Sequence, residues 1–165
     1  MMVNISDIVR VNGASVELDF KEAPSDKEPA QGCLLDEKLS FTGTLTNSNG
    51  ILQLDGHLKA VYRSECYRCL GAVSKVMALK IKENFINSAD ADETDMYPFE
   101  GKELDIGKVL NDNIILSLPM TQLCSNDCKG LCNECGANLN EVQCGCSEDD
   151  VDPRMENLNK YFDNL

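Results

Sequence analysis

The first half of the chain alternates between apolar and polar residues. In GASVELDF, Val16, Leu18 and Phe20 fall on one side of an extended chain, and Glu17 and Asp19 fall on the other. The same alternation runs through residues 39–46, through 51–63 after the turn NSNG, and through 72–86. Successive side chains of a strand point to opposite faces, so this pattern predicts antiparallel strands with one buried and one solvated face.

Two stretches interrupt the alternation, and two later ones change its period. Residues 21–32 and 87–101 are polar or acidic, and we expect both as long loops, the second of them mobile. Lys75 falls on the apolar side of its strand, which indicates a bulge or the start of the strand. Helical spacing follows near 105–117, with Asp105 as the cap, and again in 152–165, with Pro153 in the first turn.

These elements predict an α+β fold. We expect a strand-rich antiparallel sheet of about five or six strands, shaped like half a barrel and packed against one or two helices. Residues 1–119 form this domain in our interpretation. Residues 120–165 form a cysteine-rich, zinc-bound tail that ends in the second helix.

The cysteines are the chain's most specific chemical feature. The 165 residues hold nine cysteines, and six of them lie between Cys124 and Cys146. The sequence begins without the pattern of a signal peptide, and no apolar stretch approaches ~18 residues, so we expect no membrane span. We therefore place the protein in the cytoplasm, where thiols stay reduced and clustered cysteines are more often metal ligands than disulfides.

Counting ligands gives two four-cysteine sites. The six tail cysteines are too many for one tetrahedral site and too few for two, so the count closes only with the C-x-x-C of CYRCLG. We assign one site to the hairpin and the start of the tail, and the other to the tail alone, although an exchange of partners between them stays open. The first site comprises Cys66, Cys69, Cys124 and Cys128, and the second comprises Cys132, Cys135, Cys144 and Cys146.

Four thiolates suit zinc or a single iron, and the mixed spacings favour zinc. A zinc ion held by four thiolates has no open position for water, so the expected role is structural and the protein is expected not to be an enzyme. His57, the only histidine, is expected at the surface, and no nucleophile motif or small-molecule site stands out. Cys33 lies in a polar stretch without a near neighbour and is interpreted as a spare thiol.

Charge is unevenly distributed. The formal net charge is −13, which argues against a general nucleic-acid binder, yet residues 59–82 contain six basic residues and one acid. A basic hairpin beside a zinc site is a candidate contact for RNA phosphates. The alternative is an ordinary solvated face that pairs with the acidic loop. The six candidates are Lys59, Arg63, Arg68, Lys75, Lys80 and Lys82.

Three strings together resemble the YceD family of bacterial proteins and their plastid relatives. These are ECYRCLGAV, NDNIILSLPM and LCSNDCKGLCNECGANLNEVQCGC, within residues 51–146. The family is linked to accumulation of 23S ribosomal RNA and described as binding metal and nucleic acid. The resemblance implies a non-enzymatic ribosome-biogenesis factor that binds large-subunit rRNA or a ribosomal or assembly protein.

Two other functions stay open at this point. An acidic protein that shields a basic partner, without contacting RNA, would use the acidic loop and the tail. A dithiol redox protein would use Cys66 and Cys69, although thioredoxin-like proteins place that motif at the start of a helix.

Overall fold

The structure is a computed structural model that describes residues 1–165 except 25, 31, 37, 91–94 and 147–165. Within these residues it is an α+β protein with one α-helix, as the sequence predicts. The strands are β1 (Met2–Asn4), β2 (Ser15–Glu22), β3 (Leu34–Leu35), β4 (Leu39–Ser48), β5 (Ile51–Glu65), β6 (Ala72–Asn87), β7 (Tyr97–Phe99) and β8 (Glu103–Asp105). A short 3-10 helix η1 (Ser88–Asp90) follows β6, and α1 (Gly107–Ser117) follows β8.

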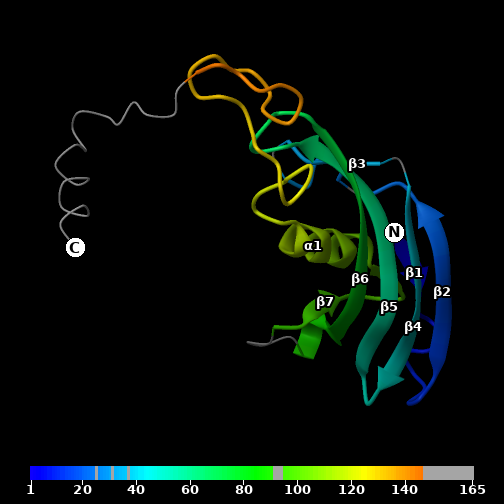
Figure 1. Ribbon diagram of the computed structural model, residues 1–165. Coiled ribbons are helices and arrows are strands. Elements are labelled where there is room, and N and C mark those ends of the chain that lie inside the picture. The colour runs from blue at the N-terminus through cyan, green and yellow to red at the C-terminus, as the bar shows by residue number, and fades with distance from the viewer. Residues whose placement is uncertain (25, 31, 37, 91–94, 147–165) are drawn as a thin grey trace, which may run out of the picture.

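The main sheet has the order β2-β4-β5-β6-β7, and β3 pairs with the far end of β5. The prediction of an antiparallel sheet is right for these strands except at one edge, where β7 runs parallel to β6. The sheet is curved and open, and its edge strands β2 and β7 do not meet (Figure 1). A second, two-stranded sheet pairs β1 with β8, which lie about a hundred residues apart in the chain.

The inner face of the main sheet carries the core. Leu52, Leu54 and Leu58 of β5 are at most 1% exposed, whereas the alternate residues Gln53, Asp55 and His57 are exposed. Helix α1 lies against this inner face (Figure 1) and buries Val109 and Ile114 there. We call the opposite, solvated side the outer face. The alternation of apolar and polar residues therefore marks the two faces as predicted.

Two glycines allow β4 and β5 to approach each other closely at the centre of the sheet. Gly43 lies directly opposite Gly56, and the buried ring of Phe41 lies across the pair. A Cβ on Gly56 would lie 2.5 Å from Cζ of Phe41 and 2.7 Å from the carbonyl oxygen of Thr42. No real side chain fits at that distance, so the ring takes the space that a larger residue would need.

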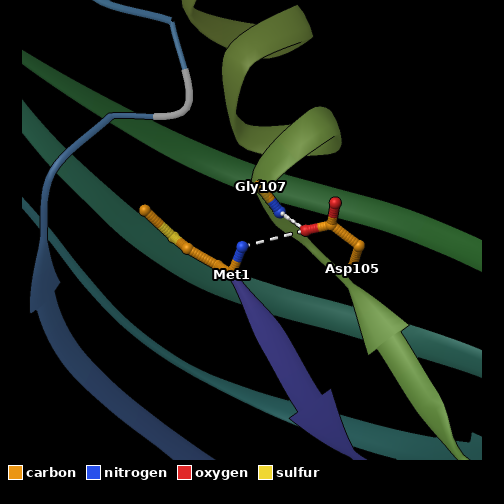
Figure 2. Close-up of polar contacts among 3 residues, drawn as sticks. All are labelled: Met1, Asp105 and Gly107. Atoms are coloured by element: carbon orange, nitrogen blue, oxygen red, sulfur yellow. Dashed lines mark hydrogen bonds and ion pairs between the residues drawn. The ribbon is translucent and has the colours of Figure 1, made fainter.

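The start of α1 is held by a carboxylate. Figure 2 shows that Oδ1 of Asp105 accepts hydrogen bonds from the backbone N–H of Gly107 at 2.9 Å and from the α-ammonium group of Met1 at 3.0 Å. Burial alone would raise the pKa of Asp105, but these bonds and the positive charge outweigh it and lower the pKa below its usual range. The N-cap residue is Ile106 and not Asp105 as predicted, so Asp105 lies one residue before the cap position and still accepts the N–H of Gly107.

Three expectations need correction. Residues 87–101 are not simply a loop, because they contain η1 and β7, and Phe99 is only 5% exposed. Cys33 is not in an exposed polar loop, since it is 4% exposed within the core. Lys75 marks neither a bulge nor the start of its strand, since β6 begins at Ala72 and its register with β5 is unbroken past Lys75.

The predicted second helix, at 152–165, lies outside the described residues. No helix in the described ranges is long and apolar enough to cross a membrane.

Candidate functional site

Strands β5 and β6 are joined by a tight turn that carries the first two cysteines. We call this turn, residues 66–71, the knuckle. The N–H of Cys66 donates to the carbonyl of Gly71 at 2.8 Å, and the N–H of Leu70 donates to the carbonyl of Cys66 at 2.9 Å. Leu70 has a φ of +57°, a left-handed conformation that disfavours a leucine. The surrounding contacts therefore hold the turn in a conformation that leucine does not prefer.

The tail crosses back over the knuckle and bonds to it along its length (Figure 1). The N–H of Tyr67 donates to the carbonyl of Gln122 at 2.7 Å, and the N–H of Leu131 donates to the carbonyl of Arg68 at 3.1 Å. The Arg68 guanidinium donates to the carbonyl of Cys128 at 2.9 Å. These contacts bring the start of the tail beside two thiols that precede it by more than fifty residues.

The first cluster consists of Cys66, Cys69, Cys124 and Cys128, whose sulfurs all lie within 4.8 Å of one another. The Cys66–Cys128 and Cys69–Cys124 sulfur pairs are 3.8 and 3.7 Å apart. A tetrahedral zinc ion with bonds of about 2.3 Å sets its sulfurs about 3.8 Å apart. Disulfide sulfurs would be only about 2.05 Å apart. The donor set and its spacing therefore fit a four-thiolate metal ion.

Part of this cluster lies in the protein interior, although Cys124 is exposed. Cys66 is fully buried and Cys128 is 3% exposed. They pack with Val73 of β6 and Leu123 of the tail in a small apolar cluster separate from the main core. The first cluster therefore joins the sheet to the tail through both sulfur contacts and apolar packing.

Backbone N–H groups stabilise negative charge on the first cluster. Burial alone would raise the pKa of Cys66, but N–H groups of Cys124, Cys69 and Arg68 outweigh it and lower the pKa to about 6. The N–H of Gly71 lowers the pKa of Cys69, yet the neighbouring sulfurs and burial raise it to about 12. A second thiolate is disfavoured next to the first because the two negative charges repel each other. A bound dication would balance these charges.

The second cluster lies wholly within the tail. It comprises Cys132, Cys135, Cys144 and Cys146, whose sulfurs also lie within 4.8 Å of one another. Gly136, with φ +70°, lets the turn close so that its N–H donates to the carbonyl of Cys132 at 2.9 Å. Cys135 and Cys146 are exposed, so this cluster lies at the surface.

The thiol pKa values of the second cluster are shifted in the same two directions as those of the first. N–H groups of Cys135 and Glu134 lower the pKa of Cys132 to about 7. The neighbouring sulfurs of Cys135 and Cys132 raise the pKa of Cys146 to about 12. The second cluster offers four thiols, as the first does, but none of its cysteines is buried.

One side chain links the two clusters. Asn140 lies between Cys135 and Cys144 in the chain, yet its Nδ2 donates to the sulfur of Cys128 at 3.4 Å. Its Oδ1 accepts from the N–H of Lys129 at 2.8 Å, which fixes the amide orientation. The loop of the second cluster thus supports a sulfur of the first. The sequence does not predict this role of Asn140, because its partner Cys128 belongs to the other cluster.

The structure brings the eight predicted cysteines together in the two predicted groups, and their binding of metal stays a prediction. Cys33 belongs to neither group, in line with its interpretation as a spare thiol.

The six basic candidates do not form one surface. Lys59, Arg63, Lys80 and Lys82 lie on the outer face of β5 and β6. Arg63 forms an ion pair with Asp36, and Lys82 lies 3.5 Å from Asp55. In the described part of the chain, Lys59 and Lys80 have no ion-pair partner.

The other two candidates point elsewhere. Lys75 lies opposite the buried Tyr62, on the parity of the inner face, although it is itself exposed. Arg68 turns toward the tail and donates to the Cys128 carbonyl. The structure therefore separates four outer-face residues from these two.

Comparison with known proteins gives a consistent family. A family model described as "Large ribosomal RNA subunit accumulation protein YceD" matches residues 54–161. A "Large ribosomal RNA subunit accumulation protein YCED homolog 1, chloroplastic" of Arabidopsis thaliana is 43% identical over 56 residues, 34% of this chain and 17% of the relative. The protein of the same description in Zea mays is 28% identical over 140 residues, 65% of this chain and 48% of the relative.

A further relative matches over nearly the whole chain. An uncharacterized protein of Mycobacterium tuberculosis is 32% identical over 169 residues, which cover 96% of this chain and 79% of the relative. The chain spans less than half the length of the two chloroplast relatives. No solved structure gives a significant match. Since the family model matches more than half of the chain, this chain belongs to the YceD family.

Proposed function

We propose that this protein is a non-enzymatic factor for ribosome production that supports the accumulation of large-subunit (23S) ribosomal RNA. The description of its family supports this role. The two cysteine clusters support the non-enzymatic part, because a metal with four thiolate ligands has no position for a reacting molecule. In this proposal the protein acts in the cytoplasm, where its cysteine thiols stay reduced. It does not act at a membrane and has no small-molecule substrate.

Each cluster holds one zinc ion in this proposal, and the ion's role is structural. The first zinc fixes the tail to the knuckle, and the second folds the tail itself. Native mass spectrometry of protein purified without chelator is expected to find two zinc ions per chain. One or two irons would overturn the choice of metal, and a metal-free chain with active dithiols would favour the redox alternative.

The outer face supplies the contact to RNA, and the observation that carries this is the exposure of two unpaired lysines on adjacent strands. Lys59 of β5 and Lys80 of β6 are close together in the sheet register, and Lys80 lies opposite His57. On the other side of β5, Ser40 and Thr42 lie opposite Lys59 and His57. Ammonium groups beside hydroxyl donors form a surface suited to phosphate oxygens.

The test is binding of a purified large-subunit rRNA fragment at several salt concentrations. The variant with both Lys59→Glu and Lys80→Glu is expected to bind more weakly. It is also expected to show a smaller salt dependence, by roughly one unit of slope for each lost phosphate contact. Unchanged affinity and slope in this variant would contradict the proposed contact.

Lys75→Glu is the matched control. It makes the same charge change on the same strand, but on the parity of the inner face. The Lys75→Glu variant is expected to bind the rRNA fragment with the affinity and salt dependence of the unaltered protein. An equal loss in Lys75→Glu would mean that overall charge, and not the outer face, governs the affinity.

Shielding of a basic protein by the acidic loop remains the second candidate. Residues 91–94 of that loop, which spans 87–101, lie outside the described residues. Deletion of residues 90–95 is expected to leave RNA binding unchanged if the outer face is the contact. Loss of a ribosomal-protein partner on this deletion, with RNA binding intact, would favour the second candidate.

A further inference from the structure

A cleft separates the knuckle from the C-terminal end of α1. Its volume is about 1040 Å³. Tyr67 and Leu70 of the knuckle line one part of it, and Ile115, Leu118 and Met120 line another. Neither Lys59 nor Lys80 is among its lining residues, so it is separate from the proposed RNA contact.

Large apolar side chains gather in this cleft and remain exposed. Met120 is 99% exposed, Tyr67 is 75% exposed and Leu70 is 62% exposed. Their side chains are not metal ligands, so the clusters do not account for them. Exposed apolar groups gathered around a hollow mark a surface that another molecule covers.

The conformation of Leu70 strengthens this interpretation. Its left-handed φ of +57° favours glycine or asparagine, and a leucine there costs free energy of folding. The leucine side chain is nevertheless exposed, so it gains little from burial in the isolated chain. A bound partner that covers Leu70 would compensate for this cost.

The charges on the cleft are acidic. Glu28 and Glu65 both line it and are exposed, and neither has an ion-pair partner within the described ranges. Arg63 also lines the cleft, but its guanidinium is paired with Asp36. Oε1 of Glu28 accepts a hydrogen bond from the N–H of Gly32 at 3.1 Å, which leaves its negative charge without a cation beside it among the described residues. Two carboxylates of this kind, beside apolar side chains, complement a basic apolar ligand and repel phosphate groups.

The cleft also contains a polar group without a partner. The buried hydroxyl of Ser64, a residue that lines the cleft, makes no hydrogen bond with any described residue. Buried hydroxyls normally have a partner. A peptide backbone placed in the cleft would supply one.

We propose that this cleft binds a basic segment of another protein. A large apolar side chain of that segment inserts among Tyr67, Leu70 and Met120, and Lys or Arg residues beside it face Glu28 and Glu65. This goes beyond the proposed function, which assigns no protein site to the cleft.

Charge argues against the other occupants. RNA is disfavoured by the two carboxylates. The chain's own residues 147–165 contain six acidic and two basic residues, and a second copy carries a net charge of −13, so both would meet the acidic cleft with like charge.

The test uses two synthetic amphipathic peptides of 15 residues with identical leucine and phenylalanine positions. One carries lysine at all polar positions and the other carries glutamate. Fluorescence anisotropy with the full-length zinc-loaded protein is expected to detect binding of the lysine peptide only. Equal binding of the two peptides would overturn the charge argument.

Variants locate the site. Tyr67→Ser combined with Met120→Ser is expected to weaken binding of the lysine peptide about thirtyfold, the loss usual for central apolar contacts. Val76→Ser is the control, because Val76 is 73% exposed on the outer face and does not line the cleft. Equal weakening in both variants, or none in the double variant, would place the peptide elsewhere.

Two further outcomes concern the occupant and the RNA contact. A tenfold gain in peptide affinity on Leu158→Ser with Phe162→Ser would assign the cleft to the chain's own C-terminal segment. Dimers that disappear on Met120→Ser in sedimentation would assign it to a second copy. The variant with Lys59→Glu and Lys80→Glu is expected to keep peptide binding, so failure of the cleft and failure of the RNA contact are distinguishable.

Discussion

Breaking the first cluster should destabilise the sheet, whereas breaking the second should not. The perturbation is Cys124→Ser, which removes an exposed ligand of the first cluster without disturbing the core. Cys69 and Cys124 are 55 residues apart in the chain. Closing a loop of that length restricts the unfolded chain by about 4 kcal/mol on the cross-link model, and a metal bridge acts in the same way.

The assay is urea unfolding followed by far-ultraviolet circular dichroism, with zinc in slight excess and a reductant present. Cys124→Ser is expected to lower the free energy of unfolding by up to about 4 kcal/mol, or the melting temperature by roughly 10 °C. Native mass spectrometry is expected to find one zinc fewer.

Cys135→Ser is the matched control. Cys135 is also an exposed tail cysteine, but its cluster closes only within the tail. This variant is expected to lose one zinc and to leave the free energy of unfolding of the sheet within about 0.5 kcal/mol of the unaltered protein. Equal destabilisation by the two substitutions, or none by Cys124→Ser, would refute the view that the first cluster fixes the tail to the sheet.

Three further predictions test other features. Asn140→Ala is expected to weaken zinc binding at the first cluster about 10- to 100-fold by chelator competition, since the amide supports a ligand sulfur; Gln143→Ala should not. Gly56→Ala is expected to cost about 1–3 kcal/mol or more in urea unfolding because its Cβ meets a buried ring, whereas Gly145→Ala, with open space around it, should be neutral. Asp105→Asn should lower the free energy of unfolding at pH 7 by less than about 1 kcal/mol, since the carboxylate is largely exposed. The folded pKa of Asp105 is lowered, so its contribution is complete above about pH 4 and disappears as the pH falls through the folded pKa. A difference that grows on acidification would contradict this assignment.

The parts of the fold that repeat a local period were predictable from the sequence. Strands β2, β4, β5 and β6 alternate over eight or more residues each, and the turn at Asn49 and Gly50 has the positive φ values that such residues allow. The division of eight cysteines into two groups of four was also predictable, because tetrahedral sites need four ligands. The sequence left an exchange of partners between the groups open, and the structure gives the grouping that uses the shortest spacings.

The parts that depend on distant pairing were not predictable. Strand β1 is three residues long and pairs with β8 about a hundred residues later, so no local pattern identifies either strand. Strand β7 is equally short and joins the sheet edge in parallel. The direction of Arg68 depends on the carbonyl of Cys128, which the tail brings to it.

The placement of the first cluster also orders events during synthesis. Cys66 and Cys69 are made 55 or more residues before Cys124, which at about 5–20 residues per second is a delay of roughly 3 to 11 seconds or longer. During that interval β5 and β6 can pair, but the cluster has only two of its four thiols. A chain that stops before Cys124 cannot complete the first cluster, so a metal bridge between knuckle and tail would form only in chains extended through Cys128.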